Sequence, residues 1–161
     1  MVRCGCSRTR TATAGFDRST IYAGDLAWPT AIVCYDGGVF IGATPDILFL
    51  KDTDGDQKAD ERRVIFTGIG DGVNRLNMQS LMNSFRWGHD NRIHGTASGT
   101  PGKVRVVGKP ERGTVSFRRG DFSFDPRVPD FRLESGGAQQ GWISMLLDGS
   151  LSAATATTFS R

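Results

Sequence analysis

The feature that most constrains this chain is a succession of short β-type runs separated by turn-forming residues, which begins near Phe16 and continues past Phe124. The runs are rich in Val, Ile and Phe, and the gaps hold Gly, Asp, Asn or Pro, as expected of strands joined by tight turns. The runs are Ser19–Ala23, Ala31–Tyr35, Gly38–Gly42, Ile47–Lys51, Arg63–Thr67, Ser84–Trp87, Arg92–Thr96, Lys103–Val107, Thr114–Phe117 and Phe122–Phe124. We therefore predict an all-β fold.

Composition agrees with this prediction. The 161 residues include 21 glycines, and 38% hydrophobic content suits a globular chain that buries a core. Only Val73–Met82 has apolar residues at helix-like spacing, and its asparagines weaken a helix, so we expect a loop there.

An internal similarity favours a repeat fold. Tyr35–Gly42 and His89–Gly95 each contain a turn followed by an alternating strand, about 54 residues apart. Units of roughly 40 to 50 residues are typical of β-propeller blades. One or two such units leave open sheet edges, so we predict a partial β-propeller.

The two ends lack the strand pattern. Residues 2–14 resemble neither a strand nor a signal peptide, and a one-nucleotide shift of Cys4–Ala14 can encode a second Asp-Thr-Asp-Gly-Asp string. A similar shift of Gly141–Ser160 can encode another turn and strand. We hypothesise off-frame segments at 1–15 and 142–161 around a propeller fragment at 16–141.

Charge and cysteine content exclude several classes. The net charge of +3 comes from scattered arginines, so no nucleic-acid partner is expected. No apolar stretch reaches the roughly 20 residues of a membrane span, and we predict neither a transmembrane segment nor a signal peptide. The three cysteines do not form a metal-ligand pattern.

A carboxylate-rich segment predicts a calcium site at residues 52–60. Its predicted ligands are the side chains of Asp52, Asp54, Asp56 and Asp60 and the carbonyl of Lys58, which occupy positions 1, 3, 5, 9 and 7 of an EF-hand-like loop. Position 6 is Gln57 instead of Gly, and position 12 is Arg63 instead of Glu. The alternative is a solvated acidic turn without metal. Any role would be structural, because no side chain remains to act as a base.

The densest group of functional side chains lies in Asn83–Gly95. Strand alternation places Phe85 and Trp87 on one face, with Trp87 in the core. His89 is expected to be exposed. His94 is the only catalytic candidate, weighed against a hydrogen-bonded structural role.

Four segments carry a resemblance to a known family: Pro45–Asp56, Asn83–Gly88, Asn91–Gly95 and Phe131–Gly137. They resemble the membrane-bound dehydrogenases of planctomycete bacteria, which are similar to quinoprotein glucose/sorbosone dehydrogenases. The resemblance spans 16–141. It implies about two to three blades of a six-bladed propeller, an exported parent protein, calcium, and a pyrroloquinoline quinone cofactor that oxidises a sugar or another small molecule. It also implies that Asn83, Arg86 and Glu134 bind the cofactor beside His94.

The chain departs from this family at the expected catalytic positions. The base histidine is replaced within Gln79–Met82, and an Arg-Asn pair is replaced by Gly137 and Ala138. Three interpretations stay open: a fragment of a sugar-dehydrogenase-like propeller, a non-catalytic calcium-stabilised propeller that binds carbohydrate or protein, and a non-functional product of a damaged gene.

Overall fold

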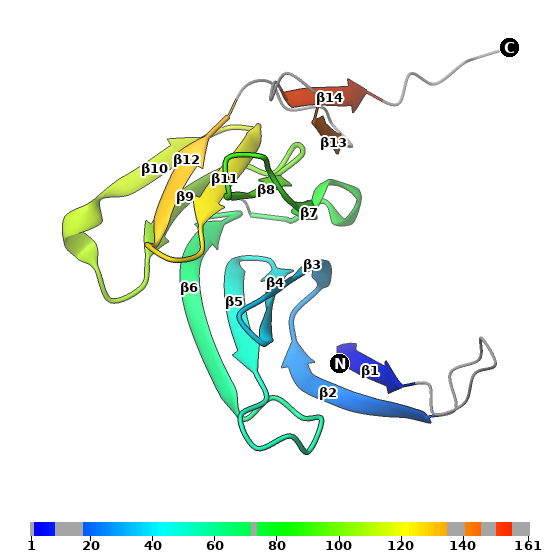
Figure 1. Ribbon diagram of the computed structural model, residues 1–161. Coiled ribbons are helices and arrows are strands. Elements are labelled where there is room, and N and C mark those ends of the chain that lie inside the picture. The colour runs from blue at the N-terminus through cyan, green and yellow to red at the C-terminus, as the bar shows by residue number, and fades with distance from the viewer. Residues whose placement is uncertain (1, 9–17, 72–73, 135–140, 146–150, 156–161) are drawn as a thin grey trace, which may run out of the picture.

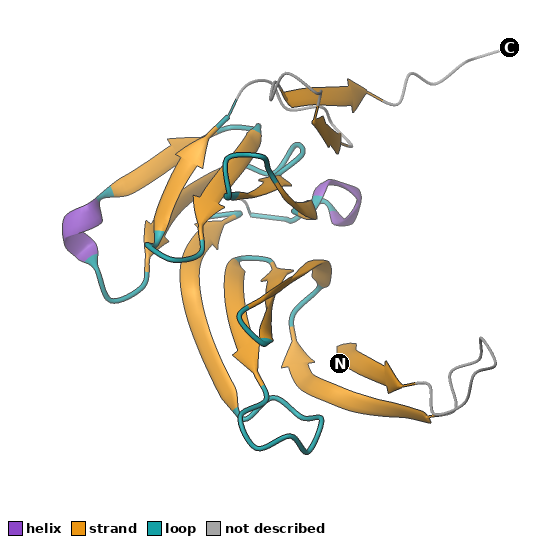
Figure 2. Ribbon diagram, in the orientation of Figure 1, coloured by secondary structure: helices purple, strands orange, loops and turns teal. Residues whose placement is uncertain are grey.

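Antiparallel strands form nearly all the regular structure in the computed structural model, which describes residues 2–8, 18–71, 74–134, 141–145 and 151–155 (Figures 1 and 2). Two large sheets occupy the centre, and a two-stranded hairpin lies near each end of the chain. Within the described residues the helical segments are two 3-10 turns, η1 (Met78–Ser80) and η2 (Pro110–Arg112). No helix there is long and apolar enough to cross a membrane.

The first sheet has six strands in the order β10-β9-β6-β5-β4-β3. Their bounds are β3 (Pro29–Tyr35), β4 (Gly38–Ala43), β5 (Asp46–Lys51), β6 (Glu61–Ile69), β9 (Gly102–Val106) and β10 (Thr114–Phe117). β3 to β6 form a meander. β6 is long enough to pair with β5 over most of its length and with β9 near its end, which adds the β9–β10 hairpin.

The second sheet has four strands in the order β12-β11-β8-β7. They are β7 (Asn83–Trp87), β8 (Ile93–Thr96), β11 (Asp121–Asp125) and β12 (Asp130–Leu133). The repeated sequence unit corresponds to β4 in the first sheet and β8 in the second, each preceded by a turn with left-handed residues such as Asp36 and Asn91. Each is the second strand of the first hairpin of its sheet.

Two further hairpins flank these sheets. β1 (Val2–Arg8) pairs with β2 (Arg18–Leu26), and β13 (Gly141–Met145) pairs with β14 (Leu151–Thr155). β13 lies against β7 and β8, so the C-terminal hairpin is next to the second sheet. The chain order of the sheets is interrupted once, because β9 and β10 of the first sheet lie between β8 and β11 of the second.

An aromatic core joins the two large sheets. Phe40 and Phe66 of the first sheet meet Phe124 of the second, with ring centroids 5.2 and 5.4 Å away. Phe124 also contacts Phe85 at 5.7 Å, and Phe124 is completely buried. The edge-to-face and tilted arrangements contribute beyond the burial of area alone. This core fixes one sheet on the other.

A second core covers the opposite face of the first sheet. Leu26 of β2 packs with Ile41, Leu48 and Leu50, all almost fully buried. The central strands β4 and β5 are therefore buried on both faces, which explains their nearly continuous apolar sequences.

The all-β prediction is confirmed, and all ten predicted runs overlap a strand. The loop predicted at Val73–Met82 contains only η1 in its described part. The strands β12, β13 and β14 were missed. The prediction that the two ends lack strands was wrong for residues 2–8, 141–145 and 151–155. In residues 2–8 the alternation of Val2, Cys4 and Cys6 was overlooked. The remainder of the hypothesised off-frame segment 1–15, and residues 146–150 and 156–161 of the segment 142–161, lie outside the described residues.

Trp87 was placed in the core, and this was also wrong. Its side chain is 42% exposed at the edge of the second sheet. The ring lies 6.0 Å from Tyr35, and its Nε1 donates a hydrogen bond to the Cys34 carbonyl at 3.2 Å. Trp87 therefore links the end of β3 to the end of β7. It lies outside the core because its indole N–H needs a hydrogen-bond acceptor, which the apolar core does not offer.

Candidate functional site

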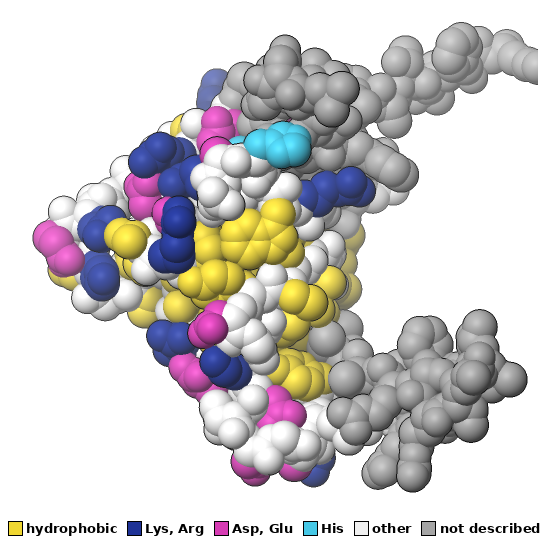
Figure 3. Space-filling model, viewed as in Figure 1, with side chains coloured by type: hydrophobic (Ala, Val, Ile, Leu, Met, Phe, Trp, Pro, Cys, Tyr) yellow, Lys and Arg dark blue, Asp and Glu magenta, His cyan; other side chains and the backbone are white. Residues whose placement is uncertain are grey.

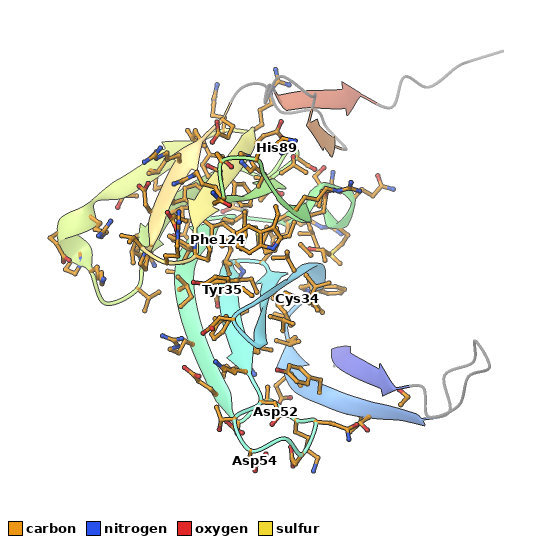
Figure 4. All side chains as sticks on the ribbon, viewed as in Figure 1. Cys34, Tyr35, Asp52, Asp54, His89 and Phe124 are labelled. Atoms are coloured by element: carbon orange, nitrogen blue, oxygen red, sulfur yellow. The ribbon has the colours of Figure 1, made fainter. Side chains whose placement is uncertain are left out.

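The aspartate-rich segment forms the loop between β5 and β6, at one end of the first sheet (Figure 4). Asp52, Asp54 and Asp60 each place a carboxylate oxygen within 4.8 Å of the others. These three side chains could hold a metal ion. The loop lies on the far side of the molecule from His89, which is exposed as predicted.

Backbone hydrogen bonds organise this loop around its carboxylates. Asp52 accepts from the N–H groups of Gly55 at 2.7 Å and Gln57 at 2.8 Å. Asp60 accepts from the N–H of Thr53 at 2.9 Å and from its hydroxyl at 2.7 Å. The sharp turn expected at position 6 is made by Gln57 itself, with a left-handed φ of 73°.

The same hydrogen bonds favour ionised carboxylates. The Thr53 backbone N–H, and then its hydroxyl, hold the pKa of Asp60 below its ordinary value. The Asp60 carboxylate is exposed to solvent, so water molecules can complete the coordination of a bound ion.

One predicted carboxylate ligand lies differently. Asp56 is outside the group of three, since its carboxylate accepts from the Lys58 N–H at 2.8 Å and lies 3.6 Å from the Lys58 ammonium. Arg63, at position 12, is part of β6 and pairs with Glu61 at 2.7 Å. The loop thus brings together three of its four predicted carboxylates.

The loop also contacts β2, the strand on the outer face of the first sheet. The Ala59 N–H donates to the Tyr22 carbonyl at 2.8 Å. Just beyond the loop, Arg62 donates to the carbonyls of Gly24 and Asp25 at 3.2 and 3.0 Å. An ordered loop therefore supports the packing of one sheet on the next.

The other predicted site residues come together on one face of the second sheet. Arg86 is paired with His94 and Asn83 with Thr96 across β7 and β8, and paired residues of antiparallel strands share a face. Glu134 reaches the same face, because its Oε1 accepts from the Ser123 hydroxyl at 2.6 Å, and Ser123 is opposite His94. The opposite face of this sheet carries the aromatic core.

His94 is a buried, hydrogen-bonded residue. It is 2% exposed, and its Nε2 lies 3.0 and 3.1 Å from the two carboxylate oxygens of Asp90. Burial opposes ionisation of Asp90, but the hydrogen bond from His94 and the Arg92 N–H hold the pKa of Asp90 below its ordinary value. The contact with Asp90 fixes the orientation of the imidazole, and Nε2 is engaged by the Asp90 carboxylate.

Sequence reasoning missed Asp121. This residue is 3% exposed, and its Oδ1, like Nδ1 of His94, has no hydrogen-bond partner in the part of the chain that the structure describes. Burial raises the pKa of Asp121, and the nearby charge of Glu134 adds to this, despite a hydrogen bond from Thr96. The alternation of Asp121, Phe122, Ser123 and Phe124 was the signal that could have found it.

A groove of about 540 Å³ lies elsewhere, at the rim between the two large sheets. Tyr35, Phe40 and Phe49 line it together with Arg63 and Arg127. The predicted site residues do not line this groove.

The fold and the loop together define an all-β domain of antiparallel sheets whose β5–β6 loop could hold a metal ion. The chain belongs to a family described as a domain of unknown function (DUF7133), whose model matches residues 10–158. No curated protein and no solved structure matched the chain.

Proposed function

We propose that the chain is a calcium-stabilised domain of the β-propeller type, in which the β5–β6 loop binds the ion. The single observation that carries the calcium proposal is the group of Asp52, Asp54 and Asp60, whose carboxylate oxygens lie within 4.8 Å of one another. Calcium is the ion that fits, because the group offers only oxygen ligands on an open loop that water can reach.

The affinity is expected to be weak. The loop lacks a bidentate glutamate, since Arg63 occupies that position, so solvent must supply several ligands. Sites of this kind in extracellular modules bind calcium at roughly 10⁻⁴ to 10⁻³ M. The role is structural: the ion relieves repulsion among the carboxylates and holds the loop in the conformation that contacts β2.

The stacking of the sheets supports the propeller part of the proposal. One face of the first sheet packs on β2, its other face packs on the second sheet, and β13 lies against the second sheet. Face-to-face packing of successive meanders is how propeller blades bury their surfaces. Blades on either side would cover further sheet faces.

The calcium proposal predicts a ligand-dependent melting temperature. At ten times its dissociation constant, calcium should stabilise the protein by about 1.4 kcal/mol, or roughly 3 to 6 °C. Asp54→Ala should abolish this shift, because it removes one charge and one oxygen ligand from the group. Asp56→Asn should reduce it less, since the Asp56 carboxylate is engaged by Lys58. Differential scanning fluorimetry with calcium and magnesium measures both effects.

Asp36→Ala is the matched control, as Asp36 is an exposed carboxylate on another turn of the same sheet, 3.4 Å from Lys51. It should leave the calcium shift unchanged. An equal calcium shift in the Asp54→Ala variant and the parent protein would contradict the proposed metal site.

A second candidate function is the binding of a sugar and a quinone on the polar face of the second sheet, as the resemblance to sugar dehydrogenases implies. The observation that favours it is that Asn83, Arg86, His94 and Glu134 share this face. Pyrroloquinoline quinone would supply the hydride acceptor when bound, and Asn83, Arg86 and Glu134 would bind and orient it.

We predict binding at most, without turnover, on this face. The His94 imidazole is 2% exposed and its Nε2 is held by Asp90, so it is poorly placed to take a proton from a substrate. With aldose and quinone supplied, dye reduction should stay at the level of the blank. Turnover that His94→Ala abolishes and His89→Ala leaves intact would show instead that the site is catalytic.

A further inference from the structure

The β9–β10 hairpin concentrates the positive charge of the molecule. Residues 103–119 contain six basic residues and one acidic residue, a net charge of +5. The rest of the chain contains 14 basic and 16 acidic residues, so it is slightly negative. The excess of positive charge, which looked scattered in the sequence, is therefore located on one structural element.

These basic side chains are exposed, and most are not neutralised by a neighbour. Arg105 pairs with Asp71 at 2.9 Å. The other five form no ion pair with any residue that the structure describes: Lys103, Lys109, Arg112, Arg118 and Arg119. By contrast, several arginines elsewhere are paired, including Arg63 with Glu61 and Arg127 with Asp125.

The register of the hairpin makes its outer face polar and basic. Lys103 is paired with Ser116 and Arg105 with Thr114, and all four side chains are exposed. The alternate residues turn inward, where Val104 is buried and the Phe117 ring stacks on Phe131. Cations and hydroxyl groups thus lie side by side along the outer face.

The hairpin projects from the body of the molecule, with η2 at its tip (Figure 1), and basic side chains are visible on this projecting end (Figure 3). Lys109 and Arg112 lie at the tip, and Arg118 and Arg119 follow β10 at the base. A linear anion along the hairpin would therefore meet cations at both ends and in the middle.

We propose that the outer face of the β9–β10 hairpin binds an acidic polysaccharide. Arginine pairs with carboxylate groups through two parallel hydrogen bonds, and the hydroxyls of Thr114 and Ser116 can bond to sugar hydroxyls. This proposal is independent of calcium and of the polar face of the second sheet.

Other polyanions fit this surface less well. Single-stranded nucleic acid binds on aromatic platforms, whereas Phe117, the aromatic residue of the hairpin, packs inward. Stable attachment to a membrane surface takes inserted apolar side chains in addition to a basic patch, and Val107 is the large hydrophobic residue of the hairpin that is strongly exposed. The outer face offers hydroxyls and cations instead.

The proposal is tested by measuring the binding of the full chain to polygalacturonate at low salt, with neutral dextran as the uncharged comparison. Polygalacturonate should bind in a salt-dependent manner and dextran should not. Lys109→Gln with Arg112→Gln, and separately Arg118→Gln with Arg119→Gln, should each weaken binding roughly tenfold or more. Each pair is exposed, so both variants should keep the melting temperature of the parent.

Arg75→Gln with Arg86→Gln is the matched control, because it removes the same charge from exposed positions outside the hairpin that also form no ion pair with any residue the structure describes. It should reduce affinity only slightly. Equal losses in the control and hairpin variants, or no binding to polygalacturonate, would overturn the proposal. Tighter binding to a DNA duplex or to phosphatidylserine vesicles at equal charge concentration would also overturn it, and would identify that polyanion as the partner.

Discussion

At the scale of single residues, Asp121 shows how a buried group can oppose the stability of the fold that contains it. Its carboxylate is almost inaccessible, and one oxygen has no hydrogen-bond partner within the described part of the chain. Because burial raises the pKa of Asp121, ionisation at neutral pH costs free energy in the folded state. The cost is absent at pH values below the ordinary pKa of an aspartate and grows as the pH rises toward the folded pKa.

Asp121→Asn should therefore stabilise the protein at pH 7, by on the order of 1 kcal/mol. An amide oxygen can still accept from Thr96, and the amide carries no charge to repel Glu134. The gain should shrink as the pH falls toward 4, where the parent carboxyl is protonated. Urea denaturation at both pH values measures this.

Asp125→Asn is the matched comparison, with the opposite sign. The Arg127 guanidinium, bonded to Asp125 at 2.8 and 2.9 Å, holds the pKa of Asp125 well below its ordinary value. The ionised Asp125 carboxylate therefore stabilises the folded state at pH values above the ordinary pKa of an aspartate, and this stabilisation is lost as the pH falls. If both variants lowered stability at pH 7, the conclusion about Asp121 would be wrong.

At the scale of elements, the junction of β6 and β9 depends on the absence of a side chain at Gly68. This residue has a φ of 108°, and a Cβ atom there would lie 2.1 Å from the Lys103 carbonyl oxygen. Gly55 has a φ of 82°, and a Cβ atom there would meet no other atom within 4 Å. A substitution at Gly55 therefore measures the cost of the left-handed backbone conformation without a steric clash.

We expect Gly68→Ala to destabilise the protein by about 3 kcal/mol or more, because it adds a backbone clash to the left-handed conformation. Gly55→Ala should cost only about 1 to 2 kcal/mol. Chemical denaturation without calcium compares the two. Equal losses would show that β9 does not pair closely with β6 at this point.

The sequence predicted these elements unevenly, for physical reasons. Runs such as Ile47–Lys51 were readable because apolar β-formers are bounded by turn residues. β12 was missed because it is four residues long and includes Asp130 and Arg132. The pairing of β9 with β6 joins segments far apart in the chain, and local pattern carries no information on such pairing.

The same distinction holds for the candidate site. The spacing of Asp52, Asp54 and Asp60 is local, and the structure brings those three together. The orientation of Asp56 toward Lys58 depends on loop torsions that spacing does not determine. The position of Asp121 beside Thr96 depends on long-range strand pairing.

At the scale of the whole molecule, the shared aromatic core should make the two large sheets unfold together. Phe124 belongs to the second sheet, yet its ring contacts Phe40 and Phe66 of the first. β5 is buried on both faces and lies in the interior of the first sheet, so its amides should exchange with solvent only on global unfolding.

Phe124→Ala should therefore lower the free energy of unfolding by about 3 to 5 kcal/mol and accelerate hydrogen exchange in β5 by the corresponding factor. Val107→Ala is the control, since Val107 is 46% exposed, and it should leave the exchange of β5 unchanged. Exchange followed by mass spectrometry resolves β5 from the edge strand β10, which should exchange faster in every variant. If Phe124→Ala accelerated exchange in β11 but left β5 at the parental rate, the two sheets would be separate folding units and the shared core would not couple them.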